Sequence, residues 1–141
     1  MFDNVLIPID LNHPGSWKKS LPMAAGLAGS DGTLHLLGIV HETGSGMVSS
    51  FLPSDFENSA LKKMKTQIDA FRDEHVPESV RVKTHVEIGH VPERILAAAT
   101  KARADLIVMA SHPPDDLRSM LVGSHAGKVV RHSPVPVLVV R

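Results

Sequence analysis

Hydrophobic residues along the chain gather in five short runs, and each run has the length of a β-strand. The runs cover residues 5–9, 34–40, 82–88, 106–109 and 135–140. In the third run apolar and polar residues alternate, which predicts a half-exposed strand at a sheet edge. The fourth run is apolar throughout, which suits a parallel strand covered on both faces. The fifth contains Pro136, and proline favours the start or the edge of a strand.

Between these runs, apolar residues recur at the spacing of an α-helix in four places. The inward-facing residues are expected to be Trp17, Leu21, Ala24, Ala25 and Ala28, then Phe56, Ala60, Leu61, Met64, Ile68 and Phe71, then Ile95, Leu96 and Ala99, and finally Ala126, Val129 and Val130. Gly29 is expected to end the first helix, and Pro22 either to kink it or to push its regular part toward the C-terminal half. Regular alternation of strands and helices predicts an α/β fold with a parallel sheet and helices on both faces.

Composition narrows the classes of protein to which this chain can belong. A length of 141 residues predicts one domain, spanning residues 1–141. Without cysteine the chain has no disulfide framework, thiolate zinc site or thiol nucleophile. Equal numbers of acidic and basic residues argue against nucleic acid as a partner, and no apolar run approaches the roughly 20 residues that span a membrane. No basic segment precedes the first apolar run, so we expect no signal peptide and a cytoplasmic location.

Candidate binding chemistry concentrates where the predicted strands end, because ligands of open α/β sheets bind beyond the carboxyl ends of the strands. Asp10, residues 40–41 and residues 109–113 are expected at these ends. Gly123 and Ser124 precede the last predicted helix, whose free backbone N–H groups favour an anion. The same pair is also typical of a plain helix N-cap, so the residues alone leave both interpretations open.

Other motifs and charged groups point to no specific site. Residues 44–46 (Gly-Ser-Gly) follow the wrong strand for a dinucleotide fingerprint, and residues 123–128 have one residue too few between their glycines for a Walker A loop. The nine histidines contain no pair at the spacing of a helical zinc motif, so no metal site is predicted. His112 and His125 are either histidines at the rim of the binding site expected beyond the strand ends or solvated loop histidines. The carboxylates at 115–116 are either exposed loop residues or ligands of a nucleotide's Mg²⁺.

The C-terminal third of the chain carries the most specific pattern. Residues 108–112 (Val-Met-Ala-Ser-His), 121–124 (Leu-Val-Gly-Ser) and 129–140 closely resemble the C-terminal signature of the universal stress protein (UspA-like) family. Residues 5–10 are similar to the family's first strand and its aspartate, and residues 110–115 look like the F/G-type branch. The resemblance extends over the whole chain. It implies a single-domain, open, twisted, five-stranded parallel sheet in the order 3-2-1-4-5, an adenine-nucleotide α-hydrolase-like fold.

Many members of this family bind ATP through a Gly-x2-Gly-x9-Gly-(Ser/Thr) motif, and this chain keeps the spacing but changes two letters. Ala110 and Pro113 stand at the first two glycines, and Gly123 with Ser124 completes the motif. The resemblance implies ATP or AMP as the ligand, with Mg²⁺ as a candidate companion. Its contact residues would be Pro8, Asp10, Val40, Met109, Ala110, His112, Pro113, Gly123, Ser124 and His125. Because Pro113 removes a backbone donor, we expect nucleotide binding to be weakened.

Different parts of the nucleotide are expected at different groups of these residues. The resemblance places Asp10 and Val40 near adenine and ribose, with Met109 and Ala110 as the floor beneath them. It places residues 123–125 at the phosphates. The residues themselves also allow a structural role, in which Asp10 ends a strand and caps a turn while Met109 fills the core.

The last predicted strand points to a partner. It is apolar and ends the chain, so we expect it at a sheet edge, where an unpaired strand seeks another. The resemblance implies a homodimer in which this strand pairs with its twofold mate through Val137, Leu138 and Val139. The function predicted is an ATP-binding stress-response protein, a homodimeric regulatory or protective module. Two alternatives are a nucleotide-free interaction protein whose site Pro113 has closed, and a slow ATP hydrolase using a pocket histidine or Mg²⁺ held by Asp10 or Asp115.

Overall fold

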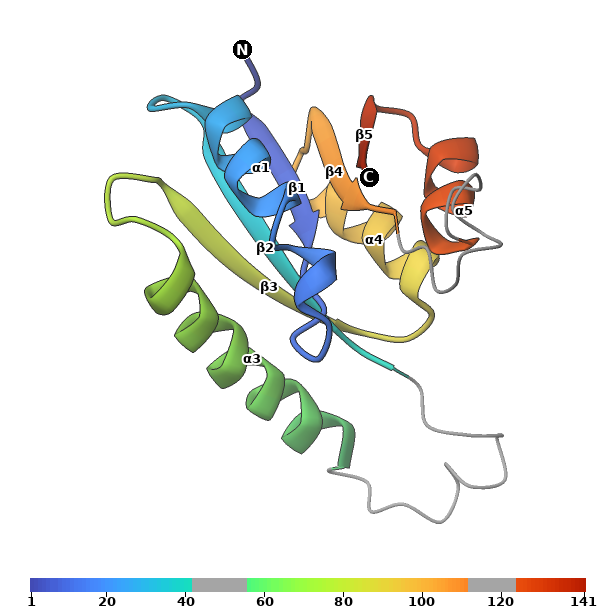
Figure 1. The fold of residues 1–141 in the computed structure, drawn as a ribbon. Helices are drawn as coiled ribbons and strands as arrows, with labels where there is room; N and C mark the ends of the chain where they lie inside the picture. Colours follow the sequence, from blue (N-terminus) through green and yellow to red (C-terminus); the bar gives the residue numbers. More distant parts are fainter. Residues whose placement is uncertain (42–55, 112–123) are drawn as a thin grey trace.

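Five strands form one parallel sheet in the computed structural model, which describes residues 1–41, 56–111 and 124–141 (Figure 1). The strands are β1 (Asn4–Pro8), β2 (Thr33–Val40), β3 (Val82–Ile88), β4 (Leu106–Ala110) and β5 (Val137–Val140). Their order is β3-β2-β1-β4-β5, and all four pairings are parallel. The predicted fold class and strand order are therefore confirmed. The two edge strands are β3 and β5, as expected.

Helices cover both faces of this sheet (Figure 1). They are α1 (Ser20–Ala28), α3 (Phe56–His75), α4 (Val91–Lys101) and α5 (Ser124–His132), and a short 3-10 helix, η1 (Pro14–Ser16), precedes α1. Helices α1 and α3 pack on one face of the sheet, and α4 and α5 pack on the other. None of the helices in the described ranges is long and apolar enough to cross a membrane.

The core is divided by the sheet because neighbouring strand residues point to opposite faces. Val5 and Ile7 of β1 pack with Ile68 of α3, whereas Leu6 packs with Ile95 of α4. All five side chains are completely buried. A strand covered on both faces is expected to be apolar at every position, which explains the unbroken hydrophobic run in β1.

The structure shows how Pro22 and Gly29 act at the two ends of α1, and it shifts one strand boundary. Helix α1 begins at Ser20, so Pro22 falls in its first turn, where a missing backbone N–H costs no helical hydrogen bond. Gly29 caps the C-terminus of α1 with φ at +67°, a conformation that glycine adopts without strain. The last strand begins at Val137, two residues later than predicted. Pro136 lies outside it and offers only its carbonyl, which accepts a hydrogen bond from the Ile107 N–H at 3.0 Å.

Two inward-facing positions were predicted wrongly. Val130 is 49% exposed, because α5 buries Ala126 and Val129 and turns the residue after Val129 away from the sheet. Phe56 is 36% exposed, although it belongs to the predicted apolar stripe of α3. Helix α3 has 20 residues and spans about 30 Å, whereas the seven residues of β3 span about 23 Å, so the sheet is too short to cover both ends of the helix.

Candidate functional site

The carboxyl ends of the strands form one continuous edge, except at a single break. Backbone hydrogen bonds join the ends of three neighbouring strand pairs. The Ile9 N–H, after β1, donates to the Leu37 carbonyl of β2 at 2.8 Å, and the Gly89 N–H, after β3, donates to the Val40 carbonyl of β2 at 3.0 Å. The Ser111 N–H, after β4, donates to the Val140 carbonyl of β5 at 2.8 Å. Between β1 and β4 the registered pairing stops at Leu6 and Ile107, before either strand ends. The order of the strands reverses at this same pair, which is where open α/β sheets bind ligands.

Pro8 explains why the β1–β4 pairing stops early. Successive residues of a parallel strand direct their backbone groups to opposite neighbours, and the Ile9 N–H points to β2. The nitrogen of Pro8 therefore faces β4, and proline has no hydrogen to donate. Pro8 and Ala110, both half-buried, flank the opening that results. The structure thus brings these two predicted site residues to the same break in the sheet.

Asp10 lies just beyond β1 and organises the turn that follows. Its Oδ1 accepts a hydrogen bond from the Asn12 N–H at 3.0 Å, and its backbone N–H donates to the Ser16 hydroxyl at 3.0 Å. Its Oδ2 faces His13 Nε2 at 3.9 Å, and the side chain is 38% exposed. Asp10 therefore has the turn-capping role that its residue type allows, while part of its carboxylate remains accessible at the ligand edge.

The other predicted site residues lie at different depths. Val40 is half-buried at the end of β2, whereas Met109 is only 5% exposed and packs in the core beneath the edge. Ser124 and His125 are exposed on the first turn of α5. His112, Pro113 and Gly123 are predicted contacts that lie outside the described residues.

His90 is a residue at this edge that sequence reasoning missed. It occupies the N-cap of α4, directly after Gly89, and its ring lies 6.3 Å from the ring of His125 between centroids, at 78°. The first turns of α4 and α5 thus lie side by side (Figure 1). A glycine closing a strand and a proline opening a helix, here Gly89 and Pro92, are the sequence signal that marks this turn.

A second histidine pair lies within β2 and β3, in the middle of the sheet, and is separate from this edge. His35 Nδ1 is 2.8 Å from His85 Nε2, and His35 Nε2 is 2.9 Å from Asn4 Oδ1. Burial, together with the smaller effects of the neighbouring His85 and Lys83, lowers the pKa of His35 to about 4. Desolvation also lowers the pKa of His85. Across the described ranges, no three His, Asp or Glu side chains gather closely enough to hold a metal ion.

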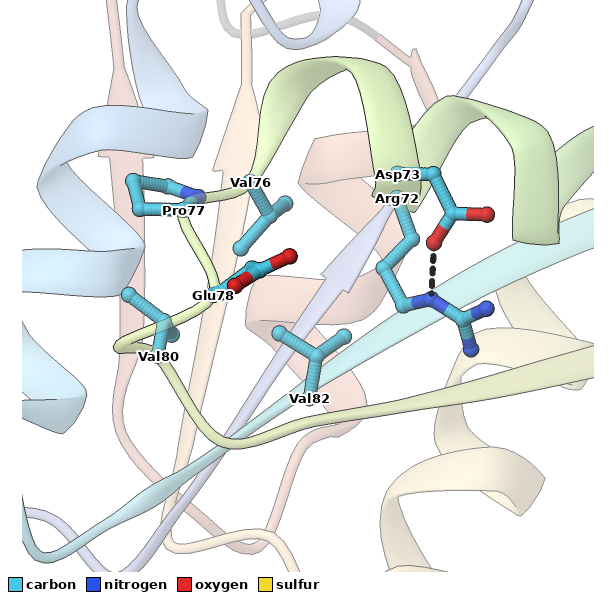
Figure 2. Close-up of a pocket in the computed structure, with 7 residues that line it drawn as sticks. All are labelled: Arg72, Asp73, Val76, Pro77, Glu78, Val80 and Val82. Atoms are coloured by element: carbon cyan, nitrogen blue, oxygen red, sulfur yellow. Dashed lines mark hydrogen bonds and ion pairs between the residues drawn. The ribbon is translucent and has the colours of Figure 1, made fainter.

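A pocket of about 420 Å³ lies at the C-terminal end of α3, where the chain turns into β3 (Figure 2). It is lined by Arg72, Asp73, Val76, Pro77, Glu78, Val80 and Val82. Val82 begins β3, so this pocket opens at the amino edge of the sheet, opposite the strand ends described above. Arg72 Nε donates to Asp73 Oδ1 at 3.1 Å, so its cation already has a counter-charge. None of the predicted contact residues lines this pocket.

Comparison with known proteins identifies one family. The chain matches the universal stress protein family over residues 1–141. A universal stress protein G of Salmonella typhimurium is 30% identical over 143 aligned positions, which cover all of both chains. The solved structure of universal stress protein UspA from Lactobacillus plantarum matches with a TM-score of 0.72 and 21% identity, covering 99% of this chain and 97% of that one.

Two further solved structures with this fold contain nucleotides. A universal stress protein in complex with cAMP matches with a TM-score of 0.62 and 17% identity, over 99% of this chain and 97% of that one. The universal stress protein from Archaeoglobus fulgidus in complex with dAMP matches with a TM-score of 0.61 and 17% identity, over 99% and 98%. At this level of identity the likeness establishes a shared fold.

Proposed function

The chain belongs to the universal stress protein family, and from this premise we propose that it binds an adenine nucleotide as a homodimeric regulatory or protective module. The observation that carries the proposal is the break between β1 and β4. It opens the carboxyl edge of the sheet between Pro8 and Ala110, at the point where the strand order reverses. Relatives with the same fold hold cAMP and dAMP, which supports adenine and phosphate as the groups recognised.

The residues around this break suit the two ends of a nucleotide. Val40 offers apolar surface and Asp10 offers carboxylate oxygens that can accept from ribose hydroxyls. Ser124 offers a hydroxyl and begins a nine-residue helix, whose first-turn N–H groups and dipole favour a phosphate. ATP and AMP both satisfy this arrangement, and Mg²⁺ would accompany ATP by binding its phosphates.

The proposed dimer uses the exposed edge of β5. In the described part of the chain β5 pairs with β4 alone, and Val137, Leu138 and Val139 are only partly buried. An apolar strand with one unpaired edge favours pairing with a second copy. A twofold axis at this edge would make both chains use the same surface, as in most homodimers. We place the protein in the cytoplasm, because a chain without cysteine suits a reducing compartment.

Isothermal titration calorimetry tests the binding proposal directly. AMP, and ATP with Mg²⁺, are titrated into the full chain, with GMP as the control for base recognition. We expect saturable binding of the adenine nucleotides with one site per chain and weaker binding of GMP. If neither adenine nucleotide gives saturable heat at millimolar concentration, the binding proposal is wrong and the nucleotide-free alternative replaces it.

A further inference from the structure

We infer that His90 and Arg94 of α4 form a second wall of the nucleotide site and, together with His125 of α5, hold the 5′-phosphate. The inference rests on the proposed function and deepens it. The Gly-x2-Gly-x9-Gly-(Ser/Thr) spacing covers residues 110–124, so it contains neither His90 nor Arg94. The assignment comes from how two helices and the end of β3 meet.

The His90 side chain faces α5 and not its own helix. His90 stands at the N-cap of α4, with an extended backbone and no side-chain hydrogen bond to the helix that it begins. Its ring meets the ring of His125 edge to face, with 6.3 Å between centroids. This separation keeps the nitrogens of the two rings beyond hydrogen-bond distance of each other. An acceptor lying beside both rings can therefore take a hydrogen bond from each helix.

Arg94 adds a permanent positive charge next to His90. Its backbone N–H donates to the His90 carbonyl at 3.0 Å, and residues four apart lie on the same side of a helix. A Cβ on Gly89, whose φ is +138°, would lie 3.2 Å from Arg94 Cδ and 3.5 Å from Nε. The arginine side chain thus lies across Gly89, at the carboxyl end of β3, and a larger residue there would displace it.

The guanidinium of Arg94 has no carboxylate partner in the described part of the chain, unlike several other cations of the protein. Lys65 and Arg72 both pair with Asp69, and Lys101 pairs with Glu87 at 2.9 Å. Arg94 is nevertheless half-buried. A half-buried guanidinium that pairs with no carboxylate among the described residues is well suited to a phosphate, whose oxygens match its paired N–H donors.

The position of these groups relative to the proposed site fixes which part of the ligand they would meet. The Gly89 N–H donates to the Val40 carbonyl, so the start of α4 adjoins the proposed adenine and ribose end. His90 in turn faces His125, which follows Ser124 at the proposed phosphate end. The three side chains therefore lie between the two ends, where the 5′-phosphate of a nucleotide would stand.

Calorimetric titration of AMP and adenosine into variants of the full chain tests this inference. Both ligands share the base and ribose, so the ratio of their affinities isolates the phosphate. We expect His90→Ala and Arg94→Ala each to lower AMP affinity about tenfold and to leave adenosine affinity unchanged, because each removes one hydrogen bond to a charged group. His132→Ala, at the other end of α5 and exposed like His90, is the matched control and is expected to keep the wild-type ratio.

The outcomes separate this inference from the function on which it rests. If the wild type binds AMP and both alanine variants keep its full preference for AMP over adenosine, the inference is overturned and nucleotide binding stands. If the wild type binds neither ligand, both proposals fall. A second measurement follows the imidazole ¹H–¹⁵N signals of His90 and His125 by NMR. AMP is expected to shift the signals of both histidines, and adenosine is expected to shift each of them less. Signals that do not change on addition of AMP would overturn the inference.

Discussion

Acid is expected to destabilise the protein through His35, which is 3% exposed in the middle of the sheet. Asn4 Oδ1 accepts from His35 Nε2, so Nδ1 of the neutral ring is left to accept from His85. A proton on Nδ1 would remove that acceptor and place a charge in a buried site. Lys83 lies close to His35, and the charges of Lys65, Lys101 and Glu87 surround His85; the three lysines oppose protonation of the pair.

The size of the effect follows from the difference in pKa between the folded and unfolded states. The pKa of His35 is about 4 in the folded protein, against 6.5 in the unfolded chain. Between pH 4 and pH 6.5 the unfolded state therefore binds more protons than the folded state. The stability that neutral His35 contributes is complete above pH 6.5 and is lost as the pH falls toward 4. The loss amounts to about 3 kcal/mol at pH 4, a large share of the 5–15 kcal/mol typical of a domain. Protonation of His85 adds to it in the same direction.

Urea unfolding between about pH 7 and pH 4, followed by circular dichroism, measures this loss. His35→Gln removes the titration while keeping a polar side chain. The variant is expected to be less stable than the wild type at pH 7 but to lose about 3 kcal/mol less on acidification. Equal losses in the wild type and the variant would refute the reasoning.

Three further predictions concern the dimer, the core and the site. Leu138→Arg places a charge on β5 and is expected to convert the proposed dimer to a monomer in analytical ultracentrifugation. A wild type that is already monomeric at micromolar concentration contradicts the proposed interface. Ile68→Ala, at a fully buried position of α3, is expected to lower the free energy of unfolding, measured by urea denaturation, by about 2–5 kcal/mol. Phe56→Ala on the same helix is the control and is expected to lower it by less than about 1 kcal/mol, because the Phe56 side chain is already exposed. Asp10→Ala is expected to weaken AMP and adenosine equally in calorimetry, since its carboxylate would meet the part that they share; a selective loss of AMP would place Asp10 at the phosphate instead.

The arrangement of strands and helices was predictable because it depends on local hydrophobic periodicity. β1 and β4 are apolar at nearly every position and lie at the centre of the sheet, whereas the alternating β3 lies at its edge. Gly29 and Pro22 acted as expected, because their backbone restrictions do not depend on distant residues. The exposure of Val130 and Phe56 depends instead on how far a neighbouring element extends, which periodicity does not encode.

The candidate site was predictable only in part. The positions of Asp10 and Val40 follow from where strands end, and Ser124 from where a helix begins. The contact between His90 and His125 depends on how α4 and α5 pack. The contact between His35 and His85 depends on the register of β2 and β3, which places the two histidines diagonally across the strand pair. Neither relation has a signal in local spacing. The contacts expected from His112, Pro113 and Gly123 remain predictions.

A crystal structure of the full chain grown with AMP tests the central claim most directly. The proposed function predicts the nucleotide at the break between β1 and β4, with the base beside Val40, the ribose hydroxyls near Asp10 and the phosphate at Ser124. AMP bound elsewhere, for example in the pocket at the end of α3, or an empty strand edge at saturating AMP, would contradict it.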